Sequence, residues 1–183
     1  GVITFEQALQ IITKRASVMT QAAKDNPGRM MVLIQPKIKF IEELILKLNL
    51  GGNRNSRSQI SLSGRTENMA EAEEAVKKGN LAARIIPLET EGGLHSECML
   101  QATKEMQKFL KGMFFADPKP GLTIIGNTAA QFITTGEQAK TETSEHISKM
   151  VQWQKTMEKM REAWVKYCLE VGNGKVLTDF GQG

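Results

Sequence analysis

The sequence lacks the features of a membrane protein, a secreted protein or a small disulfide-rich protein. It contains no apolar run of the roughly 18 to 20 residues that a transmembrane helix needs. The first residues, Gly1 to Phe5, show neither the charged region nor the long apolar core of a signal peptide. Its only cysteines, Cys98 and Cys168, define no disulfide framework. We therefore expect an intracellular protein, with the cytoplasm as the default location.

Residues typical of catalytic and metal sites are also scarce. His95 and Cys98 have the spacing of half a zinc site, but a structural zinc site needs four ligands, normally as two close pairs. The other candidates, His146 and Cys168, lie far apart in the sequence. The stretch 172–175, Gly-Asn-Gly-Lys, is better explained as a helix stop than as a phosphate-binding loop, because it lacks the flanking residues of that motif. The sequence thus predicts a protein that is not an enzyme and that holds neither a metal nor another cofactor.

Aromatic residues make up only 5% of the chain, yet both tryptophans and the single tyrosine lie in one stretch. From Ser144 to Val171, large side chains recur at spacings of three and four, which predicts one long helix with a continuous apolar stripe. The stripe consists of Met150, Trp153, Met157, Met160, Trp164, Tyr167 and Val171. It is typical of either the centre of a helical bundle or a seam for self-association. Methionine and tryptophan in place of branched aliphatic residues favour the bundle.

Periodic apolar positions predict further helices that start at the Thr4–Gln7 capping box, cover 38–48 and 67–78, and follow Ser96. The predicted fold class is mainly α: an irregular helical bundle around the 144–171 helix. We expect a single domain over residues 1–172 and a flexible tail over 173–183. The segments 30–35, 82–87 and 122–134 fit strand or helix equally. The alternative is an α+β fold, in which these segments and 59–63 form a small sheet.

The net charge of +4 is unevenly distributed along the chain. Residues 1–66 hold ten Lys and Arg against four Asp and Glu, whereas residues 67–183 hold fourteen against sixteen. Residues 51–66 are polar and basic, so the sequence predicts a mobile loop that buries too little surface to offset its ordering entropy. The candidate nucleic-acid-binding residues are those of this loop and of the helix before it: Lys37, Lys39, Lys47, Arg54, Arg57 and Arg65.

These observations favour a non-enzymatic, oligomeric protein that binds RNA or single-stranded DNA without reading its sequence. The basic residues would contact phosphate oxygens. The alternative is a helical adaptor that binds another protein through apolar helix faces and binds no nucleic acid. The wide apolar faces of 38–48 and 150–171 predict a homo-oligomer, and no membrane partner is expected.

Overall fold

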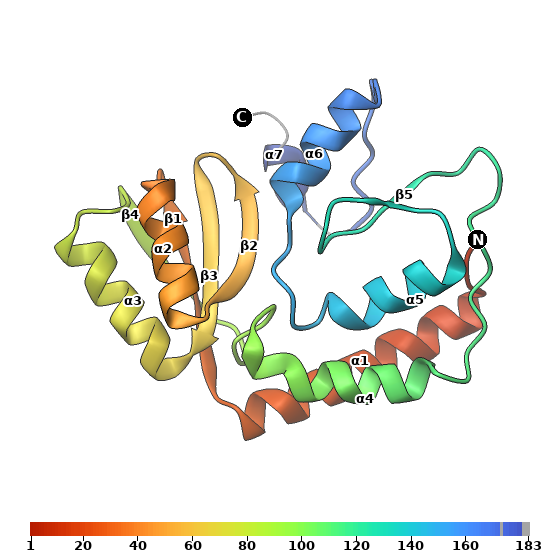
Figure 1. Ribbon diagram of the computed structural model, residues 1–183, viewed down its shortest axis with the longest axis horizontal. Coiled ribbons are helices and arrows are strands. Elements are labelled where there is room, and N and C mark those ends of the chain that lie inside the picture. The colour runs from red at the N-terminus through yellow and green to blue at the C-terminus, as the bar shows by residue number, and fades with distance from the viewer. Residues whose placement is uncertain (173, 181–183) are drawn as a thin grey trace.

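Four strands in the first half of the chain form an antiparallel sheet in the computed structural model, which describes residues 1–172 and 174–180. The strands are β1 (Gly28–Ile34), β2 (Gly51–Ser56), β3 (Gln59–Arg65) and β4 (Arg84–Leu88), and their order in the sheet is β2-β3-β1-β4. Helices α2 (Ile38–Leu48) and α3 (Thr66–Lys78) connect them in the β-α-β-β-α-β order of ferredoxin-like folds. Both helices pack on the same core as the sheet (Figure 1).

The central strand β1 shows why its apolar run was ambiguous. It is hydrogen-bonded to β3 on one side and to β4 on the other. Met31 and Leu33 face the core that the sheet shares with α2 and α3, while Met30 and Val32 alternate with them and are also buried. A strand that is buried on both faces has a continuous apolar sequence, and so does a buried helix. Because this segment is hydrogen-bonded to a neighbouring strand on each edge, it is a strand and not a helix.

A second core lies between helices (Figure 1). Helix α1 (Phe5–Asp25) runs alongside α4 (Leu100–Leu110), and the 3-10 turn η1 (Glu97–Met99) leads into α4. Helix α5 (Gly136–Glu145) packs against them. The buried side chains of this core are Ile11, Val18, Ala22, Cys98, Met99, Ala102, Met106, Leu110, Phe115, Ala139 and Ile147.

Short elements complete the fold: the paired strands β5 (Ile124–Ile125) and β6 (Phe132–Ile133), and helices α6 (Trp153–Glu162) and α7 (Val176–Phe180). The predicted capping box is confirmed, since the Gln7 amide donates to Thr4 Oγ1 at 3.2 Å and the Thr4 amide donates to Gln7 Oε1 at 2.8 Å. None of the helices in the described part of the chain has the length and apolar character that a bilayer-spanning segment needs.

The predicted mainly α bundle around a 144–171 helix is wrong. Helix α5 ends at Glu145, and the chain then runs along the edge of β2 before α6 begins. The Val151 amide donates to the Gly52 carbonyl at 2.9 Å, and the Arg54 amide donates to the Val151 carbonyl at 2.8 Å. After α6, Trp164 adopts a positive φ of 58°, in the left-handed region. Backbone pairing with the sheet edge thus prevails over the local spacing of apolar residues, and the fold is α/β.

The stripe residues consequently have different environments. The first four, Met150, Trp153, Met157 and Met160, are half-buried. Trp164, Tyr167 and Val171 are 86%, 91% and 90% exposed. Of the predicted tail, residues 173 and 181–183 lie outside the described residues, and 176–180 form α7. A single domain over 1–172 stays a prediction.

The predicted mobile loop over 51–66 is also wrong, because residues 51–65 form the hairpin of β2 and β3 and Thr66 begins α3. Its turn lies at Arg57 and Ser58. Asn55, Ser61 and Ser63 are buried in the hairpin although they are polar. Hydrogen bonds of the backbone ladder stabilise this segment, and amino-acid composition does not report them.

Candidate active site

His95 lies in the loop between β4 and η1, where that loop meets the start of β2. The Gly52 amide donates to the carbonyl oxygen of His95 at 3.0 Å, and the His95 amide donates to the Ile147 carbonyl at 3.2 Å. The backbone of His95 has a φ of 57°, in the left-handed region that residues other than glycine seldom adopt. Such conformations persist where the surroundings enforce them, and they are frequent at functional sites. Two separate segments thus hold the backbone of His95.

A glycine permits this close approach. A Cβ atom at Gly51 would overlap the carbonyl oxygen of His95. The Gly51-Gly52 pair follows α2 and begins β2, so the same two residues that separate helix from strand also let β2 lie directly against the His95 loop.

The ring of His95 has a defined tautomer. Its Nδ1 lies 2.7 Å from the main-chain carbonyl oxygen of His146, and because a carbonyl oxygen only accepts, Nδ1 carries the hydrogen. Nε2 therefore presents a lone pair. Within the part of the chain that the structure describes, Nε2 has no hydrogen-bond partner. The atom is not fully enclosed by protein either. It is open to a reactant.

Burial keeps this ring neutral. It lowers the pKa of His95 from the ordinary value of 6.5, and the positive charge of Arg15 lowers it further, although the hydrogen bond to the His146 carbonyl opposes both effects. A neutral imidazole with a free Nε2 is the form that accepts a proton in general base catalysis.

A second histidine lies against the first. His146 follows directly after α5, and its ring centroid is 4.9 Å from that of His95 with an interplanar angle of 52°. Burial lowers the pKa of His146 to about 4, and the charges of His95 and Arg15 act in the same direction, whereas Glu142 opposes them. Both rings are thus neutral at pH 7.

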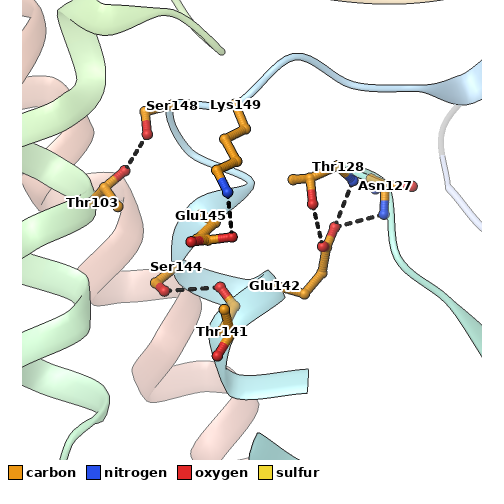
Figure 2. A network of polar contacts seen from close by, with 9 residues as sticks. All are labelled: Thr103, Asn127, Thr128, Thr141, Glu142, Ser144, Glu145, Ser148 and Lys149. Atoms are coloured by element: carbon orange, nitrogen blue, oxygen red, sulfur yellow. Dashed lines mark hydrogen bonds and ion pairs between the residues drawn. The ribbon is translucent and has the colours of Figure 1, made fainter. Parts of the chain in front are cut away.

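Glu142 holds the loop that contains Asn127 and Thr128, as Figure 2 shows, and Asn127 in turn contacts His146. Its carboxylate accepts the amides of Asn127 and Thr128 at 2.6 and 2.9 Å, and the Thr128 hydroxyl at 2.6 Å. The side chain of Asn127 reaches His146, with Nδ2 3.4 Å from Nε2. Glu142 thus fixes the main chain of Asn127, the side chain of Asn127 reaches the ring of His146, and that ring lies against His95.

Arg15 supplies positive charge to the site from α1. It is half-buried, and burial lowers its pKa. No carboxylate among the described residues lies within ion-pair distance of its guanidinium, and its charge acts on both histidines. A partly desolvated arginine without an acidic partner is suited to bind a carboxylate through two parallel hydrogen bonds.

The six basic residues predicted to bind nucleic acid lie elsewhere: directly before α2, on α2 and along the β2–β3 hairpin. Three of them are paired with carboxylates: Lys47 with Glu71 at 2.8 Å, Arg65 with Glu97 at 2.7 Å, and Arg54 with Glu42. The other three, Lys37, Lys39 and Arg57, are exposed. Much of the basic excess of residues 1–66 is therefore used in ion pairs on the protein's own surface.

Sequence reasoning missed Arg15 and weighed the two histidines only as zinc ligands. The available signal is that the chain has just two histidines, the side chains best suited to proton transfer near neutral pH. Because they are 51 residues apart in the sequence, their contact in the folded protein could not be inferred from their positions.

Comparisons with known proteins indicate which chemistry this arrangement serves. No protein-family model matches the chain. It is 27% identical over 184 residues to the malonyl CoA-acyl carrier protein transacylase of Bacillus subtilis, a match that covers 97% of this chain and 57% of that protein. Among solved structures, an acyl carrier protein S-malonyltransferase from Vibrio cholerae is 26% identical with a TM-score of 0.90, covering 100% of this chain and 60% of that one. A malonyl-transacylase in complex with a type II polyketide synthase acyl-carrier protein is 26% identical with a TM-score of 0.86, over the same shares of the two chains.

These matches correct the predicted function. The fold is that of malonyl-CoA:acyl carrier protein transacylases, and the chain spans about three-fifths of their length. The relatives are enzymes that transfer acyl groups, so the predictions of a non-enzymatic protein, of nucleic-acid binding and of a helical adaptor are wrong. The predicted homo-oligomer and RNA or DNA partner are overturned as well, since the partner seen with a structural neighbour is an acyl carrier protein.

Proposed function

We propose that this chain carries the proton-transfer site of an acyltransferase that moves a malonyl group from coenzyme A to an acyl carrier protein, with His95 as the general base. The observation that carries the proposal is the state of His95, whose Nδ1–H is bound to the main chain while Nε2 is open. The similarity to malonyl transacylases supports the substrate class. Coenzyme A thioesters are intracellular metabolites, so the proposal retains the cytoplasmic location expected from the sequence.

Transfer of an acyl group between two thiols requires one proton to leave the attacking group and one to reach the departing sulfur. Nε2 of His95 accepts the first proton as the attacking group adds to the thioester carbonyl, and the resulting imidazolium returns it to the sulfur of coenzyme A. The hydrogen bond from Nδ1 to the His146 carbonyl persists through both steps and stabilises the transient positive charge. No hydroxyl or thiol of the described residues hydrogen-bonds to Nε2. The proposal therefore assigns the proton transfer to this chain and leaves the nucleophile unassigned.

Arg15 is the proposed ligand of the malonyl carboxylate. A malonyl thioester differs from an acetyl thioester by one negatively charged carboxylate, and the half-buried Arg15 lacks an acidic partner among the described residues. Pairing would neutralise the positive charge beside the two histidines. The residue would thus select a substrate with a free carboxylate and ease protonation of His95.

The test follows radiolabelled malonyl groups from coenzyme A to the phosphopantetheine thiol of an acyl carrier protein, catalysed by the purified protein. Replacement of His95 by Ala should lower kcat/KM by about 10² to 10⁴-fold, the usual contribution of a general base. Arg15→Ala should raise KM for malonyl-CoA but not KM for acetyl-CoA, because acetyl-CoA has no carboxylate to lose contact with.

Replacement of the exposed Arg57 by Ala is the matched control for Arg15, since it removes an equal charge away from the histidines. Absence of transfer by the wild-type protein, or full activity of the His95→Ala variant, would contradict the proposal.

A further inference from the structure

The side chain of His146 has no part in the hydrogen bond that fixes the tautomer of His95. That bond ends on the main-chain carbonyl oxygen of residue 146, which any amino acid would supply. The imidazole of His146 nevertheless lies in contact range of His95, with ring centroids 4.9 Å apart and a tilt of 52°. This separation lies within the range of favourable edge-to-face contacts between aromatic rings.

The orientation of the His146 ring is itself supported from behind. Asn127 Nδ2 lies 3.4 Å from its Nε2, and the amide of Asn127 is bound to the carboxylate of Glu142 at 2.6 Å. The Asn127 carbonyl also accepts the Gln152 amide at 2.7 Å, which joins this loop to the segment before α6. The ring of His146 therefore lies between Asn127, whose loop is fixed by Glu142, and the ring of His95.

We propose that the imidazole of His146 is a positioning residue for His95, which shields the ring of the base from water and keeps its Nε2 directed at the reactants. The consequence for catalysis rests on the proposed function. The effect on the ring of His95 itself does not, because it depends only on contacts within this chain.

The charged groups near the pair are Arg15 of α1 and Glu142 of α5. A protonated His146 would place a second positive charge beside the base and Arg15, and would oppose protonation of His95 during the reaction. Burial holds the pKa of His146 at about 4, so its ring is neutral in the working range and acts by shape and exclusion of water. A neutral aromatic side chain of similar size should therefore replace it, and a small side chain should not.

The experiment is an NMR titration of the imidazole signals in the wild-type protein and in the variants His146→Ala and His146→Phe. Because the chain has only two histidines, the single signal left in each variant belongs to His95. In His146→Ala, water should reach the ring and raise the pKa of His95 toward its ordinary value, because less burial opposes its charged form. In His146→Phe, the pKa of His95 should stay at the wild-type value.

The same variants should differ in malonyl transfer. His146→Ala should lower kcat by about tenfold through loss of alignment of the base, with KM for malonyl-CoA unchanged, and its pH profile should shift toward higher pH. His146→Phe should recover most of the rate. Ser148→Ala is the matched control: it removes the 2.8 Å bond from the Thr103 hydroxyl to the same segment, drawn in Figure 2, without changing either histidine.

An unchanged pKa of His95 in a folded His146→Ala variant, or a Phe variant that behaves like the Ala variant, would overturn the inference. If the wild-type protein transfers no malonyl group while the pKa of His95 rises in His146→Ala, the proposed function fails and the shielding stands. If transfer depends on His95 but His146→Ala changes neither pKa nor rate, only the shielding fails.

Discussion

At the scale of single residues, the two histidines illustrate how burial sets the chemistry of a side chain. An imidazole that is removed from water loses more hydration energy in its charged form than in its neutral form, so its pKa falls. For His95 the result is a base that is free to accept a proton at pH 7. For His146 it is a neutral ring beside that base.

The depressed pKa of His146 predicts a pH-dependent stability. The folded protein leaves this ring neutral down to about pH 4, whereas the unfolded chain protonates it below the ordinary value of 6.5. The unfolded state therefore binds more protons between these two values, and the free energy of unfolding declines as the pH falls through that window. Allowing for the partial exposure of the ring, we expect His146 to account for roughly 2 kcal/mol of this decline.

The measurement is urea unfolding at pH 7 and at pH 4 for the wild-type protein and for His146→Gln, whose side chain does not titrate. The loss of stability between the two pH values should be smaller in the variant. Equal losses in both proteins would show that His146 is solvated in the folded state.

At the scale of elements, the contact between β2 and the His95 loop determines the site. The strand begins where the His95 carbonyl accepts the Gly52 amide, and it continues beside Val151. One edge of the sheet thus orders both segments that carry the histidines. A side chain at Gly51, at the start of β2, would push the His95 loop away from the strand.

We predict that Gly51→Ala disrupts this arrangement. The added methyl group would overlap the main chain of His95, so we expect a loss of stability of about 1–3 kcal/mol together with a large loss of transfer activity. Gly112→Ala is the matched control, because a Cβ there has no neighbour within 4 Å, and it should change stability by less than about 0.5 kcal/mol. Thermal unfolding and the transfer assay distinguish the two variants, and a fully active Gly51→Ala protein would contradict the expected clash.

The elements also differ in how well the sequence predicts them. Helix α2 was expected at 38–48 and occupies Ile38–Leu48, because its amphipathic pattern is local and needs only one covered face. The hairpin β2–β3 was expected to be a loop because residues 53–58 contain no apolar residue, although the alternative α+β fold gave 59–63 as a strand. Its stability comes from pairing with β1 and from contact with the segment around Val151, both distant in sequence.

At the scale of the whole molecule, the two main clusters of buried residues share no member. One joins the sheet to α2 and α3, and the other joins α1, α4 and α5. The histidine pair lies next to Ile147, which belongs to the second cluster, and to Gly51, which follows α2 of the first. The site is thus built where the two halves of the fold meet.

Separate cores predict additive mutational effects. Ile60→Val in the sheet core and Ile11→Val in the helical core should each cost about 0.5–1.5 kcal/mol, since each removes one buried methyl group. The double variant should show the sum within about 0.5 kcal/mol. Urea unfolding of the two single variants and the double variant measures this, and a clear departure from the sum would indicate that the cores are coupled. The exposed Trp164 offers the comparison, because its replacement by Ala should have little effect.

The sequence alone determined the local features of this protein. The capping box at Thr4 and Gln7 formed as expected, and so did the helix over 38–48. Each of these signals depends on residues within a turn or two of one another, so no distant contact is needed to establish it.

Only the tertiary structure decided the rest. The spacing of large side chains between Ser144 and Val171 fits a helix, but the main chain at Val151 instead pairs with β2. Likewise, nothing in the neighbourhood of His95 in the sequence indicates that His146 and Arg15 lie beside it. The proposed base owes its tautomer to a carbonyl 51 residues away and its neutral state to burial by the assembled fold. Both effects arise only when distant segments exclude water together, and for that physical reason the site could not be predicted from the order of the residues.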